Sequence, residues 1–339
     1  MSLPSRIRRR LRGSDLTPAP PRLSFGTWDA LDTPVVAVCH PDWRGVRTAT
    51  YGHDVPVVEV ADAGAWADEL VGRLADAQVR MLVVQGFPPG ADALLRHAHA
   101  ARIGTRVVLH SSMTQHGGEA AEAAVADLVL GLQREGVVER VGFVKEGLAE
   151  SFGALGYEVA WVPNRIPDLP AIERRDLGAG THVGVFAESF WRKNVVTQLG
   201  AVALIPDAVA HVLQRPDVAY LERLPVQEHG LLPWTEFVAL QGSVDLNLYV
   251  TLSECYPLSP IESYQAGVPA LTSRTSSVFR DDPDLWEMTT VDELDNPRAI
   301  AAAALRLLEA REDAVVRARA WAGRWDEVAR ERWQQFVQT

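Results

Sequence analysis

The sequence predicts a two-domain α/β protein in which each domain is built on a parallel β-sheet. Three observations carry this prediction. Short β-branched runs alternate with alanine-rich helical stretches from residue 34 onward, as repeated βαβ units require. The alternation is interrupted once, by VPNRIPDLP at residues 162–170, and then restarts. The length of 339 residues suits two domains of about 100–200 residues each.

The first half of the chain contains six apolar runs that we expect to form strands. Their residues are apolar at nearly every position, which is typical of parallel strands covered by helices on both faces. The predicted strands are 34–39, 57–60, 81–84, 107–110, 141–144 and 159–162, and the helices between them include 65–77, 91–101 and 119–134.

The second half repeats the pattern after a proline-rich linker. Its predicted strands are 183–186, 208–213, 220–224, 246–250 and 270–272, with helices at 194–205, 297–309 and 312–336. The predicted organisation is therefore a basic, proline-rich tail (1–33), a first Rossmann-like domain (34–165), a second Rossmann-like domain (166–320) and a final helical segment (321–339). In such sheets, ligands bind beyond the carboxyl ends of the strands, so a cleft between the two domains is the expected site.

Composition excludes several classes of protein. The formal net charge of -11 disfavours nucleic-acid binding, which needs a basic face. Two cysteines outside any metal-binding spacing predict neither a disulfide framework nor a zinc site, and they suit the cytoplasm. No apolar run is long enough to cross a membrane. The arginine-rich N-terminus has two interpretations, a solvated tail, which the prolines after it favour, and weak contact with the inner membrane surface.

The stretch 245–276 holds the strongest signal for chemistry. A buried strand ends near Val250, Glu254 follows in a polar loop, and Glu262 lies on the first turn of the next helix. A loop and helix start present free N–H groups to an anion, and carboxylates on either side suit hydroxyl groups. This arrangement fits a sugar nucleotide. The alternative is that Glu262 complements the helix dipole and Glu254 is a surface acid.

The spacing Glu254-x7-Glu262, followed by Ala-Gly-Val-Pro and a strand, resembles the E-x7-E motif of retaining glycosyltransferases of the GT-B fold. The resemblance is to the family of mannosyltransferase-like and sucrose-synthase-like enzymes. It implies that Glu254 contacts the donor sugar, that Glu262 binds the ribose, and that the backbone of Tyr256 and Leu258 cradles the phosphate. One departure is Pro257, where the family often has glycine; proline removes an N–H donor from the cradle.

The loop Phe190-Trp191-Arg192-Lys193-Asn194 is the second candidate, and Lys193 is one of only two lysines in the chain. An arginine and a lysine together can neutralise a diphosphate. The family carries the same pair to stabilise the departing diphosphate. The alternative, two solvated cations at a helix start, is disfavoured because cations there oppose the helix dipole.

Five further positions are assigned by the same resemblance. His110 follows a strand, where the family often has a histidine near the reacting sugar, although a lone histidine there is also a common structural residue. Gly45, Arg47 and His116 are weaker candidates for the acceptor side. Trp234 lies in the loop that would hold the nucleotide base, and packing beneath the next helix is its alternative role.

The resemblance implies a retaining, metal-independent hexosyltransferase that moves a sugar from a nucleoside-diphosphate sugar to an acceptor of unidentified class. The resemblance implies that the second domain binds the donor, that the first binds the acceptor, and that the final helix crosses back to the first domain. No cofactor is expected. Two alternatives stay open: a sugar-nucleotide epimerase or hydrolase of the same fold, and a non-catalytic subunit that binds sugar nucleotides.

Overall fold

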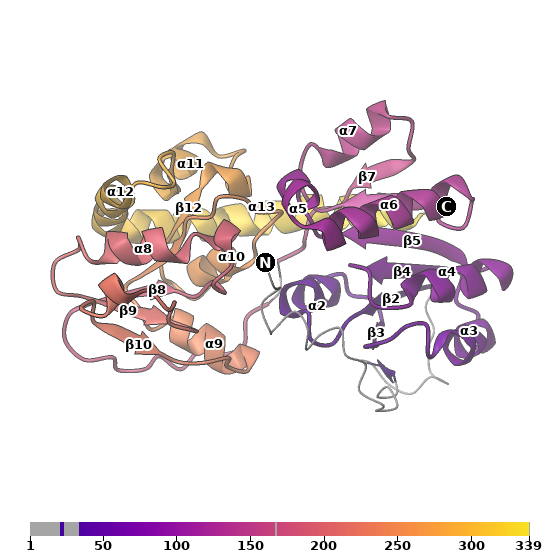
Figure 1. Cartoon of the computed structure of the whole chain (residues 1–339), viewed down its shortest axis with the longest axis horizontal. Coiled ribbons are helices and arrows are strands. Elements are labelled where there is room, and N and C mark those ends of the chain that lie inside the picture. The colour runs from indigo at the N-terminus through magenta and orange to yellow at the C-terminus, as the bar shows by residue number, and fades with distance from the viewer. Residues whose placement is uncertain (1–20, 24–33, 167, 339) are drawn as a thin grey trace.

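The computed structural model describes residues 21–23, 34–166 and 168–338. Most of the predicted tail (1–33) lies outside these ranges, so both interpretations of it stay predictions. The described chain forms two α/β domains side by side, with one long C-terminal helix running along both (Figure 1). Within the described ranges, no helix combines the length and the apolar character needed to cross a membrane.

The first sheet has seven strands in the order β1-β3-β2-β4-β5-β6-β7. All neighbours are parallel except β1, which pairs antiparallel with β3. Side chains such as Val36, Val38 and Val84 are fully buried, as expected of strands covered on both faces. The strands are β1 (Arg22–Leu23), β2 (Val35–Cys39), β3 (Val57–Glu59), β4 (Met81–Gln85), β5 (Gly104–Leu109), β6 (Arg140–Phe143) and β7 (Val159–Trp161).

Helices join the parallel strands of this sheet and bury their apolar faces against it. In α4, for example, Leu94, Leu95 and Ala98 are fully buried while the histidines of the last turn lie outside. The helices of this domain are α2 (Arg44–Tyr51), α3 (Ala67–Asp76), α4 (Ala91–Ala100), α5 (Met113–Gly118), α6 (Ala120–Arg134) and α7 (Leu148–Ala154).

The second sheet has six parallel strands in the order β10-β9-β8-β11-β12-β13. Its strands are β8 (Thr181–Val185), β9 (Ala208–Val212), β10 (Val226–Glu228), β11 (Leu246–Tyr249), β12 (Ala270–Ser273) and β13 (Thr290–Val291). Its helices are α8 (Val195–Val202), α9 (Trp234–Gln241), α10 (Ser259–Gln265), α11 (Pro283–Thr289), α12 (Pro297–Glu309) and α13 (Arg311–Val337), with short 3-10 turns η2 (Trp191–Lys193), η3 (Ala219–Leu221) and η4 (Arg274–Ser276). The two-domain α/β prediction is confirmed.

The strand order of the second sheet reverses direction between β8 and β11. The chain runs outward from β8 to β9 and β10, then returns to place β11 on the other side of β8. The loops after β8 and β11 therefore diverge and leave a crevice at their carboxyl ends, where ligands bind in open α/β sheets. The two strands approach closely at Gly184, where a Cβ would lie 2.2 Å from the side-chain oxygen of Asn247.

Helix α13 links the two domains. Near its middle, the Trp321 indole donates a 2.6 Å hydrogen bond to Asp281 of the second domain. Near its end, Trp333 stacks on His53 of the first domain with ring centroids 3.8 Å apart. The helix is continuous from Arg311, so the predicted division at residue 320 falls inside it.

One predicted strand is wrong. Residues 220–224 are not extended: the 3-10 turn η3 occupies their start, and the Leu221 carbonyl accepts a hydrogen bond from the Arg215 side chain. The strand of this region is β10, which begins after Pro225. Leu221 of this segment packs into the core without pairing in the sheet.

Candidate active site

A cavity of about 460 Å³ lies between the two domains, at the carboxyl ends of both sets of strands. The first domain contributes Arg44, Gly45 and His110 to its lining. The second domain contributes residues from the loops after β8 and β11 and from the first turns of α9 and α10, namely Arg192, Lys193, Trp234, Glu254, Tyr256, Leu258 and Glu262. The structure therefore brings together most of the residues that the sequence singled out.

The loop after β8 carries the two cations into the cavity. Asn194 ends η2 in the left-handed region with φ 56°, and its buried side chain donates a 2.6 Å hydrogen bond to the Leu294 carbonyl. The Arg192 carbonyl accepts from the Leu252 amide at 2.8 Å, which ties this loop to the loop after β11. Both cationic side chains are largely buried, with relative exposures of 16% for Arg192 and 13% for Lys193.

Glu254 is the anion at the centre of this cluster, and its side chain is 5% exposed. Its carboxylate accepts a hydrogen bond from Lys193 Nζ. Arg192 Nη1 lies 3.9 Å from its other oxygen. Burial alone would raise the pKa of Glu254, but the charges of Lys193 and Arg192 bring it below its usual value.

Tyr249 completes the cluster, and sequence reasoning missed it. Its hydroxyl lies 2.6 Å from Lys193 Nζ and donates to a Glu254 oxygen at 3.1 Å. Burial raises the pKa of Tyr249, and the nearby Glu254 raises it further, so the phenol stays protonated. A tyrosine at the last position of the strand LNLY, directly before the polar loop that holds Glu254, was the available signal.

Glu262 lies on the first turn of α10 and is 5% exposed. Burial raises the pKa of Glu262 to about 7, while the Trp234 indole and the charge of Arg44 act in the opposite direction. Trp234, the first residue of α9, donates from Nε1 to the Glu262 carboxylate at 3.3 Å. The indole and the carboxylate therefore face the cavity as one unit.

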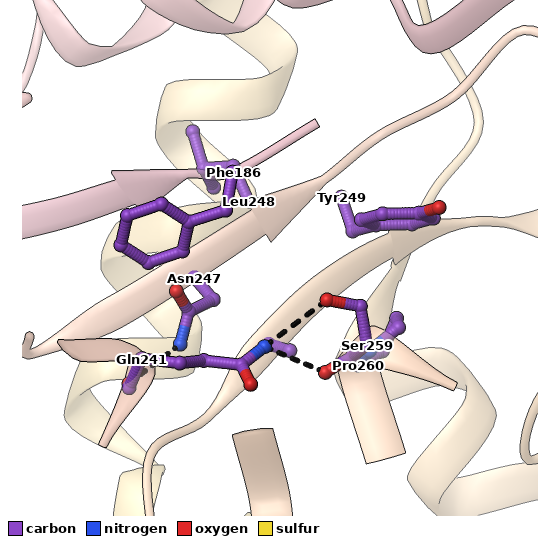
Figure 2. Close-up of a pocket in the computed structure, with 8 residues that line it drawn as sticks. Phe186, Gln241, Asn247, Leu248, Tyr249, Ser259 and Pro260 are labelled. Carbon is purple, nitrogen blue, oxygen red and sulfur yellow. Dashed lines mark hydrogen bonds between the residues drawn. The ribbon is translucent and has the colours of Figure 1, made fainter. Parts of the chain in front are cut away.

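Amide side chains hold the start of α10 in place. Figure 2 shows Gln241 directed at Ser259, where its Nε2 donates to the carbonyl at 2.7 Å and to the hydroxyl at 3.2 Å. Asn247 donates at 3.1 Å to the Gln241 carbonyl. The space enclosed there is about 10 Å³, no more than a single water needs, so this is a support for the helix start and not a ligand site.

The backbone between Glu254 and Glu262 has few donors to offer an anion. Pro257 and Pro260 carry no N–H, which leaves the amides of Leu258, Ser259 and Ile261 at the helix start. The Tyr256 carbonyl accepts a 3.1 Å hydrogen bond from Asn164 of the first domain. An anion bound here would depend chiefly on the side chains of Arg192 and Lys193.

His110 follows β5 and lines the cavity from the first domain. Its Nε2 lies 2.8 Å from Oε1 of Gln85, a fully buried side chain at the end of β4. Burial lowers the pKa of His110 to about 4, so the imidazole is neutral near pH 7. Gln85, which the sequence analysis did not identify, fixes the orientation of the ring.

Only one of the three weaker acceptor-side candidates lines the cavity. Gly45 lines the cavity. Arg47 instead donates to the Pro41 carbonyl at 3.0 Å and lies 3.7 Å from Glu59, and His116 lies 2.8 Å from the Ser111 hydroxyl; neither lines the cavity. Arg44, absent from the sequence prediction, spans the cleft and donates to the Leu232 carbonyl at 2.6 Å.

Further contacts hold the two domains against each other around the cavity. The hydroxyls of Ser112 and Ser253 lie 2.9 Å apart across the domain boundary. Lys145 donates to the Thr275 carbonyl, and Arg192 lies 3.6 Å from Glu119. In the described part of the chain, no group of three or more His, Cys, Asp or Glu side chains is arranged to hold a metal ion.

Comparison of sequences identifies no matching family model and no matching curated protein. Comparison of structures finds extensive similarity. A sucrose-phosphate synthase from Thermosynechococcus elongatus superposes with a TM-score of 0.61 at 13% identity, covering 90% of this chain and 98% of that one. An α,α-trehalose-phosphate synthase (UDP-forming) from Burkholderia xenovorans, in complex with glucose-6-phosphate, gives 0.61 at 11% identity, covering 90% and 100%.

A trehalose-6-phosphate structure from E. coli bound with UDP-2-fluoro glucose gives a TM-score of 0.57 at 10% identity, covering 89% of this chain and 98% of that one. At such low identity the likeness concerns the fold. The chain thus has the two-domain GT-B architecture that its sequence predicted.

Proposed function

We propose that this protein is a retaining hexosyltransferase that uses a nucleoside-diphosphate sugar. The observation that carries the proposal is the cluster of Arg192, Lys193 and Glu254 in the interdomain cavity, with Glu262 on the helix that follows. Two largely buried cations lie beside the Glu254 carboxylate and line the cavity, where they are the groups able to bind an anion. A ligand with a diphosphate flanked by hydroxyl-bearing groups complements this arrangement.

Each part of the donor has a proposed partner. The diphosphate lies against Arg192 and Lys193, with the few amides at the start of α10 as further donors. Glu254 accepts hydrogen bonds from sugar hydroxyls, and Glu262 accepts them from the ribose. Trp234, already bonded to Glu262, lies beside the base. The solved structures of similar fold include proteins described as UDP-forming and as bound with UDP-2-fluoro glucose, which supports a donor of this class.

The proposed reaction transfers the sugar with retention of configuration. The bond between the anomeric carbon and the diphosphate oxygen breaks, and the acceptor hydroxyl attacks from the face that the diphosphate leaves. The acceptor proton passes to the departing phosphate oxygen. Arg192 and Lys193 stabilise the charge that develops on the diphosphate, which is the role a divalent metal takes in other transferases. His110, neutral and oriented by Gln85, positions the sugar.

The first domain (34–165) is proposed to bind the acceptor and the second (166–320) the donor. A saccharide acceptor is supported by the similar structure that contains glucose-6-phosphate. The contacts between the domains at Arg44, Ser112 and Asn164 would exclude water from the bound donor and so limit its hydrolysis.

Thermal unfolding in the presence of nucleotides tests the proposal. A panel of nucleoside diphosphates and their glucose and mannose conjugates should contain at least one that raises the melting temperature, because a ligand at 100 times its Kd stabilises the folded state by about 2.7 kcal/mol. Lys193→Met should abolish that shift. Arg306→Met, which removes an exposed cation on α12, should keep it. Absence of any shift across the panel would contradict the donor assignment.

Product analysis then separates transfer from its alternatives. Incubation with the binding sugar nucleotide and a panel of sugar acceptors, followed by proton NMR of the anomeric signal, should show a product with the donor's configuration. Free sugar formed equally without an acceptor would indicate a hydrolase. An epimerised donor would indicate an epimerase, and an inverted product would contradict retention.

A further inference from the structure

Gln85 and His110 meet at the edge of the first sheet that faces the interdomain cavity. Gln85 is the last residue of β4 and pairs with Val108 of β5, so His110, two residues beyond Val108, lies just past the end of the neighbouring strand. The Gln85 side chain is fully buried, whereas His110 is half-buried and lines the cavity. The buried amide therefore supports, from behind, a ring that a ligand can reach.

The backbone that carries Gln85 is held in one position. Gly86 follows it with a φ of 68°, and the Gly86 amide donates to the Val108 carbonyl at 2.8 Å. A Cβ at Gly86 would lie 2.9 Å from the ring of Trp43, which packs against this turn. Only glycine adopts such a conformation at such close contact without strain. The turn after β4 thus fixes the place from which the Gln85 amide reaches His110.

The contact between the two side chains determines which nitrogen of His110 carries the proton. His110 Nε2 lies 2.8 Å from Oε1 of Gln85, and because a carbonyl oxygen only accepts, Nε2 is the donor. Burial lowers the pKa of His110 to about 4, so the ring holds a single proton near pH 7. Nδ1 is therefore unprotonated and acts as an acceptor.

Nδ1 is the polar atom that His110 offers to the cavity. It makes no hydrogen bond with the described residues. Among those residues, the buried polar side-chain atoms without a partner include Nε2 of Gln85 but not Nδ1 of His110, so Nδ1 keeps accessible surface. A ligand group that donates a hydrogen bond would complete this nitrogen, and a group that only accepts would face its lone pair.

We propose that Gln85 is a positioning residue, which holds His110 in the tautomer whose Nδ1 accepts a hydrogen bond from a hydroxyl of the donor sugar. The inference rests on the proposed function for the identity of the ligand, and on the contact between Gln85 and His110 for the direction of the hydrogen bond. It assigns a specificity. The sugar position that faces Nδ1 must carry a hydrogen-bond donor, because a deoxy sugar leaves the nitrogen unpaired and a fluorine sets one lone pair against another.

Nitrogen NMR of the full chain, labelled with 15N-histidine, tests the tautomer without any ligand. We expect a protonated Nε2 and an unprotonated Nδ1 for His110 near pH 7, with its signals assigned by their loss in His110→Asn. Gln85→Met removes the amide while keeping a side chain of similar length, and it should give a mixture of tautomers. Gln334→Met makes the same change on an exposed face of α13 and should leave the signals unchanged. A proton on Nδ1 of the wild type would overturn the inference, whether or not the protein binds a sugar nucleotide.

The sugar nucleotide identified by thermal unfolding then tests the contact with the sugar. Its addition should shift the Nδ1 signal of His110, and the nucleoside diphosphate that lacks the sugar should not. Gln85→Met should weaken binding of the sugar nucleotide about tenfold, as expected for one lost hydrogen bond in a buried site, and binding of the nucleoside diphosphate little. Equal losses for the two ligands, or an unchanged Nδ1 signal in the complex, would overturn the inference. A protein with the expected tautomer that binds no sugar nucleotide would overturn the proposed function, and with it the sugar contact.

Analogues of the same donor keep the inference testable if Gln85→Met does not fold. Deoxy and deoxyfluoro derivatives at each sugar position are titrated into the wild type by calorimetry. At one position both should bind about tenfold more weakly than the parent donor, and the fluoro analogue no better than the deoxy analogue. Fluoro analogues that bind as well as the parent at every position would contradict an accepting Nδ1.

Discussion

The hydroxyl of Tyr249 lies 2.6 Å from the ammonium of Lys193. The same hydroxyl bonds to Glu254 at 3.1 Å, so a neutral group bridges the cation and the anion at the base of the interdomain cavity. The cluster is buried, and each of its charges depends on these few partners. Its energetics are therefore open to direct test by substitution.

Tyr249→Phe should lower the free energy of unfolding by about 1–2 kcal/mol, because a buried charged pair loses a shared hydrogen bond. Urea denaturation measures the change. Tyr157→Phe is the control, since the Tyr157 hydroxyl makes no hydrogen bond with the described residues, and it should have little effect. Equal stability of the two variants would show that the bridge contributes nothing.

Lys193→Met should destabilise the protein by about 3–5 kcal/mol at pH 7, because Glu254 would remain buried with its charge only partly compensated. The double variant Lys193→Met/Glu254→Gln removes that charge and should regain most of the loss. It should not regain binding of the sugar nucleotide, because the cation is still missing. Comparison of unfolding free energies and of nucleotide-induced thermal shifts checks both statements; a double variant no more stable than the single one would refute the first.

Glu262 should make stability depend on pH in a direction opposite to that of most carboxylates. Burial raises its pKa from the ordinary 4.5 to about 7 in the folded protein. Between these values the unfolded chain releases a proton that the folded chain keeps, so stability falls as pH rises from 4.5 to 7 and then levels. Glu262→Gln should be more stable than the wild type by about 3 kcal/mol at pH 8 and nearly equal to it at pH 4.5. Urea titrations at four pH values measure this difference, and a difference that does not change with pH would contradict it.

The same carboxylate should couple donor binding to pH. Ribose hydroxyls bond best to the ionised form of Glu262, so affinity for the sugar nucleotide should rise as pH increases from 6 to 8. Glu262→Gln should flatten this dependence. Calorimetric titration with an intact sugar nucleotide is the appropriate measurement, and a pH profile that is the same in both proteins would exclude Glu262 as its source.

Arg165 should be an important tie between the interdomain linker and helix α13. Its guanidinium makes two hydrogen bonds with Asp326, of 3.0 Å and 2.8 Å, and the side chain is 13% exposed. Arg165→Ala should lower the free energy of unfolding by about 2–4 kcal/mol. Arg96→Ala, which breaks an exposed pair with Glu135, should change it little. Similar losses of unfolding free energy in the two variants would show that burial of the Arg165–Asp326 pair adds no stability.

The sequence located most strands because their apolar runs have the length and β-branched composition of buried parallel strands. It failed at 220–224, where Leu221 packs into the core while Tyr220 is exposed and the segment does not pair, since apolar side chains alone do not distinguish burial from strand pairing. It also missed β13, whose two residues give no periodic signal.

In the candidate site, residues that belong to a motif with a known spacing, such as Glu254 and Glu262, could be identified from the sequence. Residues whose role depends only on their neighbours in space could not be identified in this way. Tyr249 reads as a strand residue until the fold places its hydroxyl between Lys193 and Glu254. Arg47 and Arg44 are equivalent in the sequence, yet one turns to Glu59 and the other crosses the cleft.

The sequence by itself determined the two parallel-sheet domains and the loops in which the charged residues lie, because hydrophobic periodicity and motif spacing act over short stretches of chain. Only the tertiary structure decided which of those charges meet, how deeply they are buried and therefore how their pKa values shift. It also placed Arg44 beside Leu232 and Ser112 beside Ser253, pairs whose members are 188 and 141 positions apart along the chain. Such contacts depend on how two domains and α13 pack together, and no local pattern of residues records that packing.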